Sequence, residues 1–115
     1  MEDQEIYRIQ AELCQAVGNP VRLQIIHILR QGGLYVSDLT KLTGLPQSNV
    51  SRHLTILRNA GLVNAQRHGA NIRYSLANPK IVAVCDMMRD IIAAEQERLS
   101  TLLSANFSGD TQQPH

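Results

Sequence analysis

Apolar residues recur every three or four positions through the first part of the chain, which is typical of helices. The first predicted helix covers 5–17 and ends at Gly18. Asn19 and Pro20 then begin a second helix through Gln31, because asparagine is a favoured N-cap and proline fits the first helical turn. The second helix is apolar on most of its sides, so we expect it to be buried.

The middle of the chain predicts two shorter helices and then a β-hairpin. Ser37 is the expected N-cap of the first of these helices, and Gly61 ends the second. Beyond Gly61 the spacing changes to that of strands on either side of Gly69, which we place at the hairpin tip. In order, the predicted elements are an extended piece at 34–36, helices over 38–43 and 47–59, and strands over 62–67 and 71–76.

A long final helix is predicted to begin at Asn78 and Pro79, which repeat the N-cap and proline signature. The polar segment 104–115 that follows it is predicted to be a disordered tail. Neither a repeat nor a linker divides the preceding sequence, so residues 1–103 are expected to form one domain. The expected fold class is mainly α with a small β-hairpin, in the order α-α-α-α-β-β-α.

Charge is distributed unevenly, although the formal net charge is only +1. No Asp or Glu occurs from Leu39 to Cys85, whereas acids outnumber Lys and Arg in both terminal segments. Such a distribution concentrates positive potential on one part of the surface and favours a polyanionic partner. The cations of the acid-free stretch are Lys41, Arg52, Arg58, Arg67, Arg73 and Lys80.

Two short helices joined by a glycine-containing turn and followed by a hairpin predict a winged helix-turn-helix that binds double-stranded DNA. Its second helix offers short polar side chains and a cation to base edges in the major groove. The hairpin offers cations and polar groups to phosphates or to the minor groove. The predicted DNA-binding residues are Gln47, Ser48, Asn49, Ser51, Arg52 and His53 on the helix, and Arg67, His68, Asn71 and Arg73 around the hairpin tip.

The first and last predicted helices carry longer apolar stripes than so small a core can cover. A monomer would expose these stripes as a contiguous patch, which soluble monomers avoid. We therefore expect a homodimer that pairs through these two helices around a two-fold axis. Such pairing would place two DNA-reading helices about one DNA turn apart, as a palindromic operator requires.

Three groups of residues resemble the ArsR (arsenic-repressor-like) family. They are the segment from Ala16 to Ile26, the stretch from Gln47 through Leu54 to Val63, and Gly69 with Arg73 and Tyr74 in the hairpin. The resemblance covers residues 6–103. It implies a dimeric transcriptional repressor of stress or metal-resistance genes, released from DNA by a small inducer.

The places where members of that family sense ligands lack the required residues here. Tyr35, Val36 and Ser37 stand at the thiolate pair of the helix-turn-helix. His27 and about Ala93 replace the cysteines of the redox- and persulfide-sensing members, and we expect His27 to be a hydrogen-bonded core histidine. The zinc site of the last helix would fall on Asn78, Pro79, Lys80, Ile91 and Ala94, which are not its ligands, so no metal site is expected.

Cys14 and Cys85 remain as candidate sensing residues, one on the first helix and one on the last. If their thiols approach each other within or between subunits, a disulfide, a polysulfide link or a soft ion such as As(III) could move the helices and release DNA. The alternative is that both are small buried hydrophobes. No cofactor is expected beyond such a soft metal or metalloid.

Other function classes fit the sequence less well. An enzyme is disfavoured because there is no nucleotide-binding loop, no Ser/His/Asp arrangement and no pair of carboxylates outside the terminal helices. A winged helix that serves only as a protein-interaction module is an alternative, as is a DNA-binding regulator without a chemical sensor. The acidic start differs from a signal peptide, and no apolar run reaches the ~20 residues that span a bilayer, so a cytoplasmic protein is expected.

Overall fold

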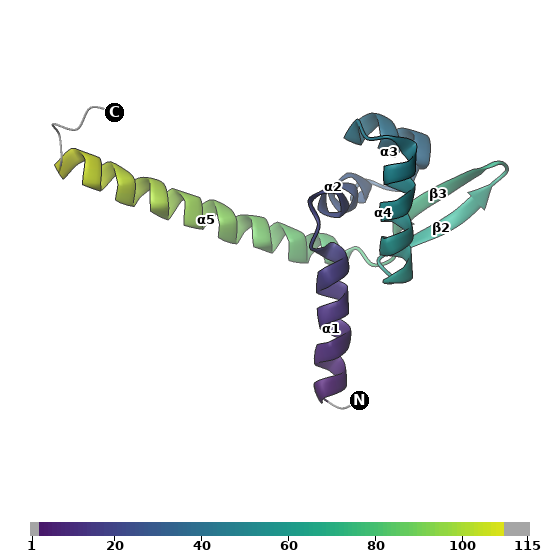
Figure 1. The fold of residues 1–115 in the computed structure, drawn as a ribbon, viewed down its shortest axis with the longest axis horizontal. Helices are drawn as coiled ribbons and strands as arrows, with labels where there is room; N and C mark the ends of the chain where they lie inside the picture. The colour runs from purple at the N-terminus through teal and green to yellow at the C-terminus, as the bar shows by residue number, and fades with distance from the viewer. Residues whose placement is uncertain (1–2, 110–115) are drawn as a thin grey trace. The chain divides into compact units, whose positions relative to one another are not determined.

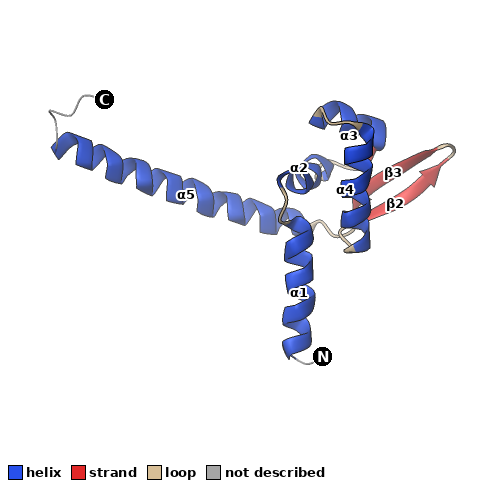
Figure 2. Ribbon diagram, viewed as in Figure 1, coloured by secondary structure: helices blue, strands red, loops and turns tan. Residues whose placement is uncertain are grey.

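The structure is a computed structural model that describes residues 3–109. The chain divides into two compact units, Met1–Val82 and Ala83–His115. α5 (Lys80–Gly109) crosses this boundary, whereas the sequence predicts one domain over 1–103. The elements of the first unit are α1 (Asp3–Val17), α2 (Pro20–Leu29), β1 (Leu34–Tyr35), α3 (Val36–Thr43), α4 (Gln47–Asn59), β2 (Val63–His68) and β3 (Asn71–Leu76) (Figures 1 and 2).

One apolar core in the first unit holds α2, α3 and α4 together. Its largest fully buried side chains come from these three helices, and they are Ile25, Ile26, Leu29, Leu39, Val50, Leu54 and Leu57. α2 contributes three of them, so the prediction that the second helix is buried is confirmed. The spacing of Val50, Leu54 and Leu57 places them on one side of α4, which fixes how this helix is rotated about its axis.

The starts of α2 and α3 show two ways of satisfying free N–H groups. The Asn19 side-chain oxygen accepts hydrogen bonds from the N–H groups of Val21 (2.9 Å) and Arg22 (3.2 Å), which confirms the predicted N-cap. The prediction of Ser37 as N-cap of α3 is wrong. The helix begins at Val36, two residues before the predicted start, because the Asp38 carboxylate reaches back and accepts the N–H of the N-cap Tyr35 at 3.0 Å.

The three strands form one antiparallel sheet in the order β1-β3-β2. The β2–β3 hairpin is paired from Val63–Leu76 to His68–Asn71, which leaves Gly69 and Ala70 as a two-residue turn. Gly69 has a φ of 64°, a left-handed conformation that glycine adopts without steric cost. β1 is the element that the sequence did not predict as part of a sheet, because two residues show no alternation and their partners lie far along the chain.

α5 exposes large apolar side chains along most of its described length. They are Val84, Met87, Met88, Ile91, Ile92, Leu99, Leu102 and Leu103. The helix runs to Gly109, so the first six residues of the predicted disordered tail are helical, and residues 110–115 lie outside the described part of the chain. The sequence between Lys80 and Gly109 contains no glycine or proline, which allows the helix to continue. Among residues 3–109, no helix combines the length and apolar character needed to cross a membrane.

Candidate nucleic-acid interface

α4 presents its first turn and one of its sides to solvent. Gln47, Ser48 and Arg52 are exposed, and Asn49 and Ser51 are half-buried. This follows from the burial of the opposite side of the helix in the core. The polar side chains of α4 are therefore positioned by apolar packing, which holds them in place before any partner binds.

A cleft of about 300 Å³ lies between the start of α3, the start of α4 and the hairpin. Gln47 and Ser51 line it from α4, and Asn71 lines it from the hairpin. Tyr35 and Tyr74 form part of its wall. The structure thus brings helix and hairpin residues that the sequence predicts as DNA-binding to the two sides of one cleft.

The β2–β3 hairpin, which we call the wing, carries Arg67, His68 and Asn71 as exposed residues around its tip. His68 and Asn71 are cross-strand partners beside the turn. The His68 ring also contacts the Tyr35 ring edge to face, with 6.2 Å between ring centroids. In Figure 1 the wing extends beyond α4, so its polar tip is open to a partner.

Arg73 lies in the middle of β3, opposite Gln66, and is therefore further from the turn than the sequence-based prediction placed it. It pairs with Tyr35 of β1 and is half-buried. Its guanidinium covers the backbone of Gly33 so closely that a Cβ there would lie 2.3 Å from the Arg73 Cζ. Arg73 is half-buried because β3 is the central strand of the sheet, so residue 73 lies between β1 on one side and β2 on the other.

His53 is buried, with 7% of its surface exposed, so the prediction that it contacts DNA is wrong. Its Nδ1 atom lies 3.2 Å from Nη1 of Arg22. Burial lowers the pKa of His53, and the positive charges of Arg52 and Arg22 lower this pKa further. The helical repeat carries the signal for this position, because residue 53 lies three after Val50 and four before Leu57 on the inner side of α4.

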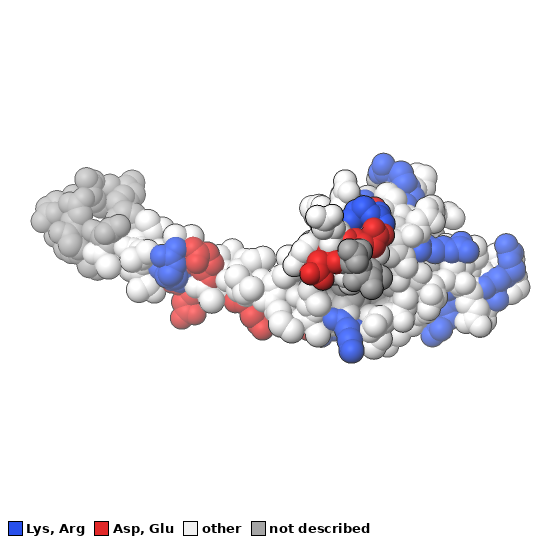
Figure 3. Space-filling view, turned by 90° about the horizontal axis from the view of Figure 1, so that it is seen from below, with Lys and Arg blue, Asp and Glu red and all other residues white. Residues whose placement is uncertain are grey.

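Basic side chains are spread over the surface of the helix-turn-helix and the wing, whereas acidic side chains gather on the two terminal helices (Figure 3). Lys41, Arg52, Arg58 and Arg67 are all exposed within the stretch that contains no acid. Positive potential on this surface attracts a polyanion such as the DNA backbone.

The two candidate sensing thiols differ in their surroundings. Cys14 on α1 is exposed and Cys85 on α5 is half-buried, and neither forms a disulfide. Burial raises the pKa of the Cys85 thiol, Asp86 raises it as well, and Arg89 opposes them. Cys85 therefore holds its proton at neutral pH, which makes it a slow nucleophile.

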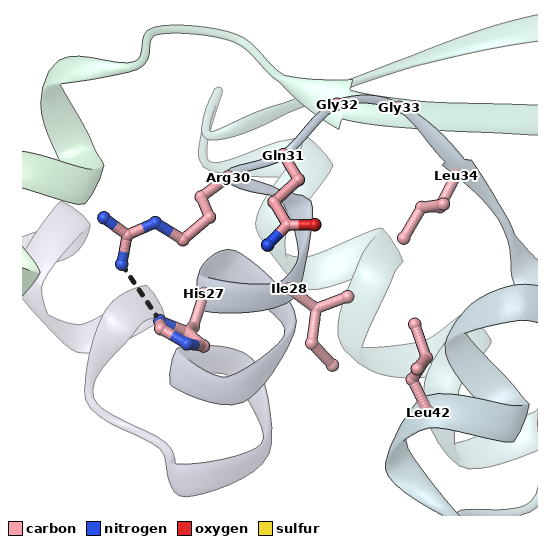
Figure 4. A pocket seen from close by; sticks show the side chains of 8 residues that line it. All are labelled: His27, Ile28, Arg30, Gln31, Gly32, Gly33, Leu34 and Leu42. Atoms are coloured by element: carbon pink, nitrogen blue, oxygen red, sulfur yellow. Dashed lines mark hydrogen bonds between the residues drawn. The ribbon is translucent and has the colours of Figure 1, made fainter.

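A second cleft, of about 440 Å³, lies between the end of α2 and the end of α3 (Figure 4). His27, Arg30 and Gln31 line one part of it, and Ile28, Leu34 and Leu42 line the other. His27 is half-buried on this wall, with its Nδ1 3.4 Å from Nη1 of Arg30, so it is hydrogen-bonded as expected but is not a core residue. Within residues 3–109, no three His, Cys, Asp or Glu side chains are grouped so that they could hold a metal ion.

Comparison with known proteins identifies the class to which this architecture belongs. Residues 19–65 match the family model described as bacterial regulatory protein, arsR family. The chain is 34% identical over 94 residues to an uncharacterized HTH-type transcriptional regulator of Mycobacterium tuberculosis, a match that covers 81% of this chain and 82% of that protein.

Solved structures agree with the sequence match. A crystal structure of an M. tuberculosis protein has 32% identity and a TM-score of 0.73, over 86% of this chain and 99% of that one. A solution structure from Mycobacterium bovis has 26% identity and a TM-score of 0.74, over 85% of this chain and 93% of that one. The M. bovis protein is described as a homodimeric winged helix-turn-helix DNA-binding domain of a possible ArsR-family transcriptional regulator. The present chain belongs to the arsR family of bacterial regulatory proteins and is a transcriptional regulator with a DNA-binding winged helix-turn-helix.

Proposed function

We propose that the protein is a homodimeric repressor that binds a palindromic operator in the cytoplasm and leaves it when a small inducer acts. The observation that carries this proposal is the cleft between α4 and the wing. The residues that line it from α4 and the wing belong to the stretch of sequence without acids, and predicted DNA-binding residues lie on both of its sides. This arrangement is complementary to a DNA backbone that passes between a helix in the major groove and a wing beside it.

Residues of α4 would read the operator sequence. Arg52 is suited to guanine and Gln47 to adenine, because their side chains can form two hydrogen bonds with those bases. Each such pair discriminates against a wrong base by roughly 1–3 kcal/mol. Ser48, Asn49 and Ser51 would supply further contacts to bases or phosphates, and Arg67, His68 and Asn71 of the wing would contact phosphates or the minor groove.

Apolar surface on the terminal helices supports a dimer. α5 exposes many large apolar side chains, including Met87 and Ile91, and α1 exposes Ile6 and Ile9. Covering such surface is the main driving force for association. The M. bovis neighbour is described as homodimeric, which favours the same arrangement here, in which residues 1–103 act together in DNA binding and dimerisation.

The released state depends on an inducer, for which Cys14 and Cys85 are the candidate sensing residues. A reagent that links or binds these thiols would rearrange α1 and α5, and with them the spacing of the two α4 helices. The C14S and C85S variants should bind DNA normally yet stay bound when oxidant, polysulfide or arsenite is added. If both variants are released like the wild type, the protein is a DNA-binding regulator without a thiol sensor.

Arg52→Ala tests the DNA-reading role of α4. Arg58→Ala is the matched control, because Arg58 is also an exposed arginine on the same helix. The probe is a duplex selected by the wild-type protein from a random-sequence library. Arg52→Ala should weaken binding to it by about 5- to 150-fold per half-site and relax the preference at the contacted base pair. Arg58 lies near the end of α4, away from its DNA-reading first turns, so Arg58→Ala should keep the preference.

An unchanged sequence preference in Arg52→Ala would remove α4 from the reading role. Failure of the wild type to select any duplex would favour the protein-interaction module instead. A steep loss of affinity with salt would support DNA binding, since neutralised phosphates release counterions.

A further inference from the structure

Arg22 makes contacts that connect α1 to α4. Its Nε donates to the backbone oxygen of Ala16, and its Nη2 donates to that of Gln15 at 3.5 Å, both near the end of α1. Its Nη1 lies 3.2 Å from Nδ1 of His53 on α4. One guanidinium on α2 therefore joins a helix that we place in the dimer interface to the helix that we place on DNA.

The end of α1 provides a favourable place for this cation. The last carbonyl groups of a helix have no partner within it, and they carry partial negative charge. The Gly18 N–H bonds the oxygen of Cys14 at 2.8 Å, and the Asn19 N–H bonds that of Val17 at 2.7 Å. The Nε of Arg22 supplies the partner for the Ala16 oxygen and so completes the cap of α1. The Nη1 of the same guanidinium remains directed at His53 of α4.

His53 can accept a hydrogen bond from Nη1 of Arg22 only while its imidazole is neutral. A guanidinium donates hydrogen bonds and accepts none, so Nδ1 of His53 must be the acceptor. Protonation would place a hydrogen on Nδ1 and a positive charge beside Arg22. Among the described residues, the charges that act on His53 are those of Arg22 and Arg52, and both are positive. On the α1 side, the acidic residue near this contact is Glu12, which lines a shallow cleft together with Arg22.

We propose that Arg22 and His53 are positioning residues, which hold α4 at a fixed distance and angle from the end of α1. This inference rests on the proposed DNA-binding function. His53 directly follows Arg52 on α4, so a change in how His53 is held is transmitted to the reading surface within one residue. Operator affinity should then require a neutral His53, although His53 does not itself contact DNA.

The test is the affinity for the selected duplex from about pH 7.5 to about pH 5.5, which spans the ordinary histidine pKa of about 6.5. All variants carry His68→Asn, because His68 lies on the wing that we place beside the DNA backbone and a second histidine at the DNA would complicate the comparison. His53→Asn keeps an oxygen near the Nδ1 position and does not titrate. His27→Asn is the matched control, since His27 lies in the other cleft.

We expect the affinity of the His68→Asn protein to fall as the solution is acidified. The added His53→Asn change should remove this fall and leave the affinity at pH 7.5 within about threefold, whereas the added His27→Asn change should leave the fall in place. Arg22→Lys should weaken binding at pH 7.5 by about tenfold, because lysine cannot reach α1 and α4 together.

The inference is overturned if the His53→Asn protein and its parent lose affinity in parallel as the pH falls. It is also overturned if the Arg22→Lys protein binds the selected duplex as tightly as its parent at pH 7.5. Far-UV circular dichroism establishes that each variant is folded, and the pH profile of His53→Asn decides the matter even if Arg22→Lys does not fold. If the wild type selects no duplex at all, the proposed function fails, and this outcome is distinct from the other two.

Discussion

Arg67→Gln removes one positive charge from each wing and tests whether the wing contacts DNA phosphates. Arg67 is exposed on β2 beside the hairpin turn, with Ile72 as its cross-strand partner. Arg67 lies near the middle of the stretch from Leu39 to Cys85, which contains no Asp or Glu. No carboxylate close to it in the sequence therefore competes with a phosphate for its charge. Arg67→Lys is the matched control, because it changes the shape of the side chain but keeps its charge.

The size of the effect follows from counterion release. Each neutralised phosphate contributes about 0.9 to the slope of log affinity against log salt concentration, so the loss of two wing contacts in a dimer lowers the slope by about 1.8. With that difference, doubling the salt concentration weakens the wild type about 3.5-fold more than it weakens Arg67→Gln. Because phosphate contacts carry no sequence information, the loss should be similar for all duplexes.

Fluorescence anisotropy with the selected duplex, over about a fourfold range of KCl concentration, measures these slopes. We expect the slope of Arg67→Lys to match that of the wild type and the slope of Arg67→Gln to be lower. Equal slopes for all three proteins would refute the phosphate contact. A loss of affinity confined to one sequence would instead mean that Arg67 reads a base.

The core, a helix cap and the buried histidine give three further predictions for stability. Leu54→Ala should lower the free energy of unfolding by about 2–5 kcal/mol in urea titrations, because it leaves a cavity where a fully buried side chain lies, whereas the exposed Thr55→Ala should change it by less than about 0.5 kcal/mol. Asn19→Ala should cost about 1 kcal/mol by the same measurement, since it removes the cap of α2, and an unchanged midpoint would show that water replaces the cap. The folded-state pKa of His53 lies below its unfolded value, so the unfolded chain takes up the proton first, and stability should fall as the pH decreases through about 6.5. That decrease should be smaller in His53→Asn, and identical profiles would contradict the assignment.

Local signals predicted the helices well. Glycines and the spacing of apolar residues placed α4 over Gln47–Asn59 as the structure has it, and Asn19 with Pro20 marked the start of α2. These features depend on residues close together in the chain, where the energetic preference is local. The hairpin was likewise predicted from Gly69 and the two flanking strands.

Features that depend on distant partners were not predicted. β1 pairs with β3 across most of the helix-turn-helix, and this pairing leaves Arg73 half-buried between two neighbouring strands. The contact between Arg22 and His53 joins residues 31 positions apart, so neither residue alone shows that it exists. His53 was misassigned because its residue type suggests DNA binding, although its position in the helical repeat places it on the buried side.

The central claim is that two chains bind one operator and recognise its sequence. Native mass spectrometry of the protein with the selected duplex, and in competition with a scrambled duplex of equal length, tests both parts at once. We predict a complex of two chains per duplex, with an affinity at least about 10³-fold higher for the selected sequence. A complex with one chain per duplex, or equal binding to the scrambled sequence, would contradict the account.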